Sequence, residues 1–235
     1  MISFQPNQEL LQRAGTILAD FDQIYWVLGG AASGKSTVCR AIAKQTAVSV
    51  YDMDAHIYGA YMGRYTPERH PASLAWFTAV NPLAFILSRS TTEFDNLNRA
   101  ANVEYLDLFA EEMAQTRPQG PLLVDGGLTH PSVLAQVLPT ERIVCLGVET
   151  AVSQHAWNHD PERAEMKQSV LNLPDGTTAW AQFLAFDQQI NETMLAESKT
   201  AGIKIYRRAA PTTVTELAGS VVDYFGKAVD SSFPV

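Results

Sequence analysis

A short segment rich in small residues carries the clearest chemical signal in the sequence. Residues 29–36 match the Walker A pattern G-x-x-x-x-G-K-[ST]. The segment consists of Gly29, Gly30, Ala31, Ala32, Ser33, Gly34, Lys35 and Ser36, and is followed by Thr37. Small residues let backbone N–H groups approach phosphate oxygens, and the N-terminus of a following helix adds positive potential. Lys35 would contact the β- and γ-phosphates, and the Ser36 hydroxyl would bind Mg²⁺. The segment therefore predicts a nucleotide-binding loop that works with magnesium.

Two aspartates form the second chemical signal. Asp52 and Asp54 follow a predicted strand at 47–51. Because the carboxyl ends of parallel strands meet at one edge of a sheet, we expect both aspartates near the glycine-rich loop. Asp52 would hold a Mg²⁺-bound water, and Asp54 would bind and deprotonate the hydroxyl of a phosphoryl acceptor. The alternative is a helix cap, a role in which aspartate is common.

The elements that must position these residues alternate along the chain. Apolar runs predict strands at 24–28, 47–51, 121–125, 142–148 and 203–206. Apolar periodicity predicts helices at 7–21, from the glycine-rich loop to about 45, and at 72–80, 82–90, 93–116, 131–137, 177–200 and 212–226. This alternation predicts an α/β fold, in which a five-stranded parallel sheet lies between two helical layers (α/β/α).

Length, charge and cysteine content narrow the classes of protein. The 235 residues suit a single domain spanning 1–235, and no linker divides them. A formal net charge of -8 disfavours nucleic acid as a partner. Cys39 and Cys145 are too few for a disulfide framework or a metal site of four cysteines. Because we find neither a signal peptide nor a long apolar stretch, we expect a cytoplasmic protein that does not bind membranes. We expect it to be a monomer or a homodimer.

Two classes of nucleotide-binding protein fit the sequence poorly. GTPase-type switches need an Asn-Lys-x-Asp segment, which does not occur here. Many motor-type ATPases end a strand with Asp-Glu, whereas the third predicted strand ends with Asp125, Gly126 and Gly127. Kinases that phosphorylate small molecules remain as the expected class.

The motifs together resemble those of shikimate kinase and the related gluconate kinases, within the nucleotide-kinase-like P-loop group. The resemblance rests on the glycine-rich loop, on Asp52-x-Asp54-x-x-Ile57, and on Gly126-Gly127. It implies a P-loop NTPase fold with an acceptor-binding insertion and a mobile lid, and it implies ATP as the phosphoryl donor. It also implies that Asp52 lies near the metal, that Asp54 binds the acceptor hydroxyl, and that Gly126 and Gly127 border the acceptor.

The sequence departs from that pattern in two places. Asp125 occupies the first of three positions that are usually glycine in shikimate kinases. The insertion, at about 57–118, is much longer than theirs, and we expect it to be mainly helical and to lie over the C-terminal ends of the strands. The resemblance therefore implies a small-molecule kinase, but it does not imply that shikimate is the acceptor.

Arginines in the insertion, the lid and the last loop are candidates for binding anions. Arg64 and Arg69 lie in a loop rich in Tyr, Gly and Pro, where they would bind a phosphate or carboxylate of the acceptor, unless they are ordinary surface arginines. The lid is expected over 150–172, where Arg163 would stabilise the phosphoryl group during transfer. Arg207, after the fifth predicted strand, either stacks on the adenine or belongs to a surface turn.

Two functions of different classes follow. The first is an ATP-dependent kinase that transfers the γ-phosphate to a hydroxyl, or a phosphate, of an unidentified small molecule. The alternative is a nucleotide-dependent regulatory or binding ATPase with a macromolecular partner, for which the long insertion leaves room. A polynucleotide kinase is a third possible function, which the net charge of -8 disfavours.

Overall fold

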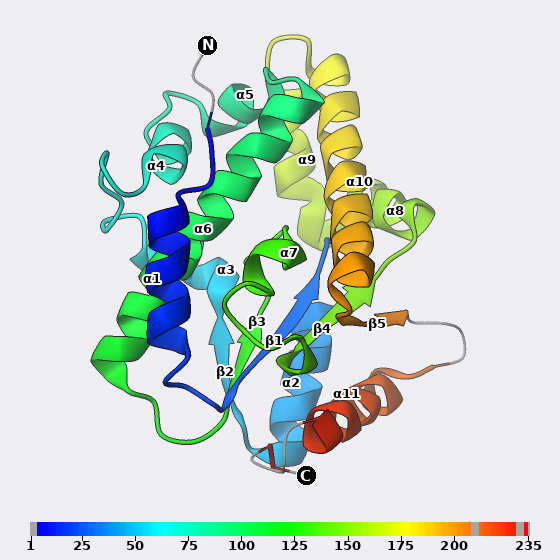
Figure 1. Ribbon diagram of the computed structural model, residues 1–235. Helices are drawn as coiled ribbons and strands as arrows, with labels where there is room; N and C mark the ends of the chain where they lie inside the picture. The colour runs from blue at the N-terminus through cyan, green and yellow to red at the C-terminus, as the bar shows by residue number, and fades with distance from the viewer. Residues whose placement is uncertain (1–3, 208–211, 229–232, 235) are drawn as a thin grey trace.

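The computed structural model describes residues 4–207, 212–228 and 233–234 (Figure 1). In this part of the chain, the strands are β1 (Ile24–Gly29), β2 (Ser49–Asp52), β3 (Leu122–Asp125), β4 (Ile143–Gly147) and β5 (Lys204–Arg207). They form a 5-stranded sheet in the order β2-β3-β1-β4-β5, and every neighbouring pair is parallel. Each strand begins within two residues of its predicted start, so the α/β class and the parallel sheet are confirmed.

Helices cover both faces of this sheet. The described helices are α1 (Gln8–Leu18), α2 (Lys35–Thr46), α3 (Met53–Ala55), α4 (Pro71–Phe77), α5 (Pro82–Leu87), α6 (Thr91–Thr116), α7 (Pro131–Leu134), α8 (Thr150–His159), α9 (Ala164–Leu171), α10 (Gly176–Ala201) and α11 (Val214–Ala228), with short η1 (His56–Ala60), η2 (Thr140–Arg142) and η3 (Pro161–Arg163). Figure 1 shows α1, α6 and α10 in front of the sheet and α2 behind it. None of these helices has the length and apolarity needed to cross a lipid bilayer.

The central strand β1 is buried on both faces, and its side chains alternate between two cores. Trp26 packs edge-on against Phe109 of α6 at 5.1 Å between ring centroids. Tyr25 points the other way and packs against Phe225 of α11 at 5.0 Å. Because successive residues of a strand point to opposite faces, an unbroken apolar run such as 24–28 requires helices on both sides.

Helix α6 departs from the expectation that the whole insertion lies above the strand ends. Its residue Phe109 contacts Trp26 of β1 and Tyr51 of β2, so this part of α6 forms a layer of the core. The helix begins with a capping box in which Ser90 and Glu93 bond each other's backbone N–H groups. The separate elements of the insertion are therefore η1, α4 and α5, together with the loops that join them.

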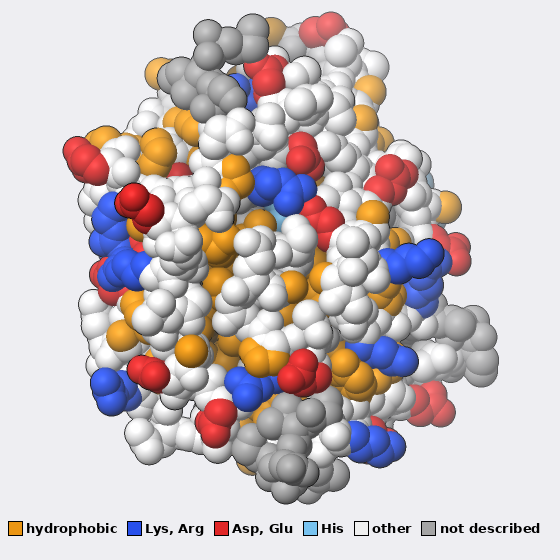
Figure 2. Space-filling model, in the orientation of Figure 1, with side chains coloured by type: hydrophobic (Ala, Val, Ile, Leu, Met, Phe, Trp, Pro, Cys, Tyr) orange, Lys and Arg blue, Asp and Glu red, His pale blue; other side chains and the backbone are white. Residues whose placement is uncertain are grey.

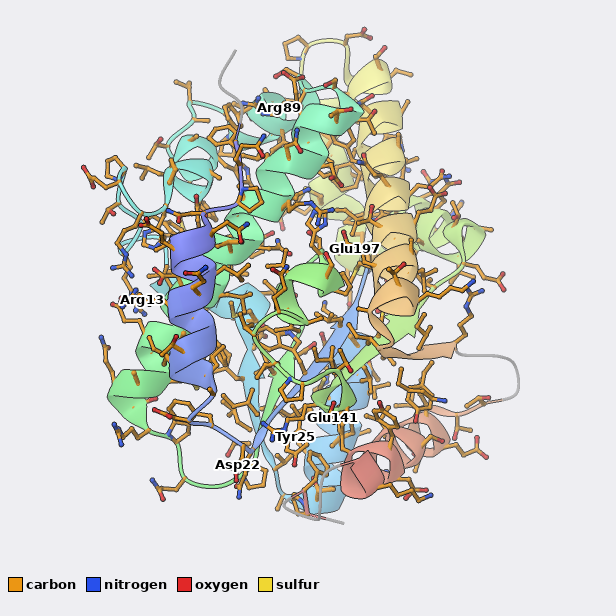
Figure 3. The ribbon with its side chains drawn as sticks, viewed as in Figure 1. Arg13, Asp22, Tyr25, Arg89, Glu141 and Glu197 are labelled. Atoms are coloured by element: carbon orange, nitrogen blue, oxygen red, sulfur yellow. The ribbon has the colours of Figure 1, made fainter. Side chains whose placement is uncertain are left out.

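Buried polar side chains of α6 hold neighbouring segments in place. Asn102 Oδ1 accepts hydrogen bonds from the backbone N–H groups of Thr129 and His130, after β3. Glu104 accepts from the first N–H groups of α4, at 2.9 and 2.7 Å. Asp107 pairs with Arg13 of α1 at 2.5 Å, and Figure 3 labels this arginine. Each bond compensates for burying a polar group, and α6 thereby fixes the loop after β3, the insertion and α1.

Candidate active site

The glycine-rich loop connects β1 to α2, and two of its residues adopt the left-handed backbone conformation, which glycine tolerates and alanine rarely adopts. Gly34 has a φ of 82° and Ala32 a φ of 63°, both in the left-handed region. The N–H of Ser33 donates to the carbonyl of Gly30 at 3.2 Å, which closes a tight turn. No side chain caps α2 at Gly34. The first-turn N–H groups of α2 are thus available for an anion, as a phosphate-binding loop requires.

Lys35 and Asp54 form an ion pair at the carboxyl edge of the sheet. The Lys35 Nζ lies 3.1 Å from Asp54 Oδ2. Burial lowers the pKa of Lys35, but the charges of Asp54 and Asp125, together with the hydrogen bond to Asp54, outweigh burial and raise the pKa. The pair lies over Gly126, whose carbonyl accepts from Trp26 Nε1 at 2.8 Å. The structure therefore brings together Lys35, Asp54 and Gly126, three residues selected from the sequence.

Gly126 and Gly127 are required by the close approach of α3 and Lys35. Both have positive φ angles, 72° and 80°. A Cβ at Gly126 would lie 2.2 Å from Lys35 Cε and 2.8 Å from Asp54 Oδ2. A Cβ at Gly127 would lie 2.1 Å from Cγ of the buried Met53. Any larger residue would displace the Lys35–Asp54 pair or α3.

The loop after Gly127 is fixed by a second polar cluster. Glu197 of α10, labelled in Figure 3, accepts from the backbone N–H of Ser132 at 3.0 Å. It also faces His130 Nδ1 at 3.2 Å and pairs with Arg99 at 2.6 Å. Burial raises the pKa of Glu197, but hydrogen bonds from His130 and Ser132 outweigh burial and lower it to about 2. This cluster anchors α7 against α10 beside the two glycines.

Asp125, the last residue of β3, is a site candidate that the motifs left unassigned. It is 6% exposed and stands opposite Asp52 in the register of β2 and β3. Burial raises the pKa of Asp125, with opposing contributions from Lys35 and from a hydrogen bond with Ser36. Among the described residues its Oδ1 has no hydrogen-bond partner. A single aspartate at the end of a buried strand is the sequence signal that would have found it.

The side chain of Asp52 acts as the helix cap that was its alternative role. Its Oδ1 accepts from the backbone N–H of Ala55 at 2.9 Å, at the start of α3. The backbone carbonyl of Asp52 lies 2.7 Å from His56 Nδ1. Capping orients α3 so that Asp54, two residues on, faces Lys35. The role of Asp52 near the metal stays a prediction, and its side chain in the structure caps α3.

Arg64 and Arg69 are held by carboxylates of α6. Arg64 pairs with Glu111 at 3.3 Å and with Glu112 at 3.4 Å. Arg69 pairs with Glu111 at 2.9 Å and also with the buried Asp107. Both guanidinium groups thus tie the loop of the insertion to α6. The ion pairs of both arginines are with carboxylates of α6 rather than with Asp54, and their role in binding the acceptor stays a prediction.

The predicted lid region, 150–172, forms α8, η3 and α9. Arg163 lies over the ring of Trp157 with its guanidinium carbon 4.3 Å from the centroid. Its Nε is 3.9 Å from Asp160 Oδ2, a long ion pair. The guanidinium of Arg163 is therefore held mainly by stacking on Trp157, and the ion pair with Asp160 contributes less.

A buried polar chain connects this region to the glycine-rich loop. Ser153 of α8 donates to Asp187 Oδ2 of α10 at 2.6 Å, and Asn191 donates to the same oxygen at 3.2 Å. Burial raises the pKa of Asp187, while the charge of Arg163 acts to lower it. Asn191 in turn touches the loop, because a Cβ at Gly30 would lie 1.9 Å from its Oδ1. Through Asp187 and Asn191, α10 contacts both α8 and the glycine-rich loop.

Arg207 is the last residue of β5, at the same edge of the sheet. Its side chain is exposed and passes Gly147, where an added Cβ would lie 3.3 Å from Arg207 Cγ. The adjoining segment, 208–211, lies outside the described residues, so stacking on adenine stays a prediction. A cavity of about 390 Å³ lies at the other end of the sheet, beside Asp22 and Gly120. It is remote from these residues and has no part in the site.

Comparison with known protein families finds no match for this sequence, and no curated protein shows significant similarity. In the described part of the chain, no three His, Cys, Asp or Glu side chains gather as a metal site. Magnesium is commonly bound by one or two protein oxygens together with substrate phosphates and waters. The pair formed by Ser36 and Asp125 fits that requirement.

Proposed function

We propose that this protein is an ATP-dependent phosphotransferase with a P-loop NTPase fold, which transfers the γ-phosphate to a small-molecule hydroxyl. The observation that carries the proposal is the 3.1 Å ion pair between Lys35 and Asp54 above Gly126. A phosphate-binding lysine beside a carboxylate at the carboxyl edge of a parallel sheet is what phosphoryl transfer to a hydroxyl needs. Gly126, which has a positive φ and no side chain, allows Lys35 and Asp54 to approach the end of β3 closely.

Each part of the site has a role in binding ATP. The backbone N–H groups of residues 29–34 and the N-terminus of α2 receive the phosphates, and Lys35 offsets their charge. Ser36 and Asp125 provide a hydroxyl and a buried carboxylate with an unpartnered oxygen, which suits Mg²⁺ directly or through water. Magnesium, when bound, would neutralise charge that develops on the phosphate oxygens.

Asp54 orients the acceptor and takes its proton. The acceptor O–H bond breaks and its proton passes to an Asp54 carboxylate oxygen. The acceptor oxygen forms a bond to the γ-phosphorus, and the bond from that phosphorus to the bridging oxygen of ADP breaks. Lys35, which pairs with Asp54 in the structure, is positioned to contact the transferring group at the same time. Arg163 of the lid region is the candidate for a second positive charge over the phosphates.

The test separates nucleotide binding from transfer. Lys35→Ala should remove most of the thermal stabilisation by ATP·Mg²⁺. Asp54→Asn should keep that stabilisation but lose about 10²–10⁴ in transfer rate, because a general base is lost. Asp22→Asn is the matched control, since Asp22 is exposed and lies at the lower end of the molecule in Figure 3. ADP release would be screened over sugars, sugar acids, nucleosides and nucleoside monophosphates.

The same experiment distinguishes the regulatory alternative. An ATP-binding protein that releases ADP at the same slow rate with every small molecule, and with Asp54→Asn, would favour a regulatory ATPase. Equal ATP binding by Lys35→Ala and the wild type would contradict both functions. On the face shown in Figure 2, Lys and Arg side chains are interspersed with Asp and Glu. That face lacks the basic stripe that would favour a polynucleotide as the acceptor.

A further inference from the structure

A cluster of aromatic side chains begins one helical turn after Asp54. η1 follows α3 directly, and it places Tyr58 four residues after Asp54. The Tyr58 ring packs edge-on against Trp76 at 5.7 Å and against Phe77 at 6.1 Å. Phe77 in turn stacks on Tyr65 at 5.3 Å, with 12° between the ring planes. We name Tyr58, Tyr65, Trp76 and Phe77 the aromatic wall.

Tyr58 is the member of the aromatic wall that a ligand can reach. Its side chain is 56% exposed. Burial nevertheless raises the pKa of its hydroxyl, and the charge of Asp54 raises it further. Because α3 continues directly into η1, the exposed Tyr58 ring lies about one helical turn from Asp54, so one ligand can contact both side chains. Trp76 adds a buried Nε1 donor with no acceptor among the described residues.

The charges around this surface disfavour an anionic acceptor. Asp52 stands opposite Asp125 in the register of β2 and β3, and Asp54 follows two residues after Asp52, so three carboxylates gather at this edge of the sheet. Lys35 pairs with Asp54 and is also needed for the phosphates of ATP. The arginines expected to bind an acceptor anion, Arg64 and Arg69, already pair with carboxylates of α6. A phosphate or carboxylate on the acceptor would meet like charge and would have to break existing ion pairs.

We propose that the acceptor is an uncharged alcohol that stacks a flat ring face on Tyr58 and presents its hydroxyl to Asp54. The proposal rests on the proposed function and specifies its substrate class. Tyrosine and tryptophan stack on the face of a heterocyclic base or of a sugar ring, so a nucleoside and a neutral sugar share the chemistry required. Transfer converts the neutral alcohol into a phosphate monoester. Once Asp54 has released the proton that it took, its negative charge faces the new phosphate group, and repulsion favours release of the product.

The experiment compares acceptors in matched pairs of equal skeleton and different charge. The probes are a nucleoside with its 5′-monophosphate and an aldose with its sugar acid, each tested by ADP release. We expect the neutral member of at least one pair to have a kcat/KM at least tenfold higher than that of its anionic partner. Tyr58→Ala should raise KM about tenfold with little change in kcat, because stacking contributes to binding. Tyr58→Phe should keep the wild-type KM, because the ring face remains.

The control variant is Val80→Ala, in the same insertion, where the valine is fully exposed and away from Asp54 in sequence. A Tyr58→Ala variant that behaves like Val80→Ala would overturn the proposal. So would a preference for the anionic member of both pairs. Failure of the proposed function looks different: no probe, neutral or anionic, would then raise ADP release in a way that depends on Asp54, or ATP·Mg²⁺ binding would be absent or independent of Lys35.

Discussion

Replacing Gly126 with alanine adds one methyl group beneath the Lys35 side chain. The new Cβ would lie 2.2 Å from Lys35 Cε and 2.8 Å from Asp54 Oδ2, distances too short for real contacts. The φ of 72° at Gly126 adds backbone strain that alanine does not tolerate well. Lys35 is a flexible side chain, so we expect it to move away from Asp54 while the fold survives.

The strain and the displacement have different magnitudes and different effects. A non-glycine residue in the left-handed region costs roughly 1–2 kcal/mol, and each kcal/mol lowers Tm by about 2–4 °C in a domain of this size. Losing a half-exposed ion pair adds little to the free energy of unfolding. Displacing a group that stabilises the transferring phosphate typically costs about 10²–10³ in rate. The variant should therefore be modestly less stable and severely impaired in transfer.

Gly120→Ala is the matched control for the backbone. Gly120 has a φ of 82°, and an added Cβ there has no atom within 4 Å. It pays the conformational cost alone, so both variants should lose a similar amount of Tm in the absence of nucleotide. The difference between them isolates the contact with Lys35.

The assay is thermal unfolding with and without ATP·Mg²⁺ at a concentration about a hundredfold above the wild-type Kd. Wild type and Gly120→Ala should be stabilised by about 2.7 kcal/mol, and a tenfold weaker Kd in Gly126→Ala would reduce this to about 1.4 kcal/mol. If Gly126→Ala bound ATP and transferred phosphate as well as Gly120→Ala, the placement of Lys35 over Gly126 would be unrelated to function.

Two further predictions concern the supports of the site. Gly30→Ala should weaken ATP binding at least tenfold, because its Cβ would lie 1.9 Å from Asn191 Oδ1. Adding Asn191→Ala should restore much of the thermal stabilisation by ATP. A double variant that binds ATP no better than Gly30→Ala would contradict this prediction. Glu197 has a folded-state pKa of about 2 against an ordinary value of 4.5, so its stabilisation is present above about pH 4.5 and is lost as the pH falls toward 2. Glu197→Gln should cost on the order of 3 kcal/mol in chemical unfolding at pH 7 and much less at pH 3, and a cost independent of pH would be the opposite result.

Local patterns were sufficient to predict most of the elements. Strands 24–28 and 121–125 are unbroken apolar runs because both faces of the central strands are covered, and glycine or proline marks many of the ends. The order β2-β3-β1-β4-β5 was beyond this reasoning, since an apolar run does not specify its neighbours. Helix α6 shows the same limit, because its amphipathic pattern predicted a helix but not that Glu104 and Asp107 would be buried with partners from α4 and α1.

What the sequence by itself determined about the candidate site is its local chemistry. Lys35 and Ser36 were found by spacing alone, because a loop that wraps phosphate is made of consecutive residues. The tertiary structure decided which distant groups meet them. It placed Asp54 against Lys35, made Asp52 a cap, added Asp125, and paired Arg64 with carboxylates of α6. Ion pairs and burial depend on residues brought together by the sheet order, and the charge of a side chain alone does not specify its partner.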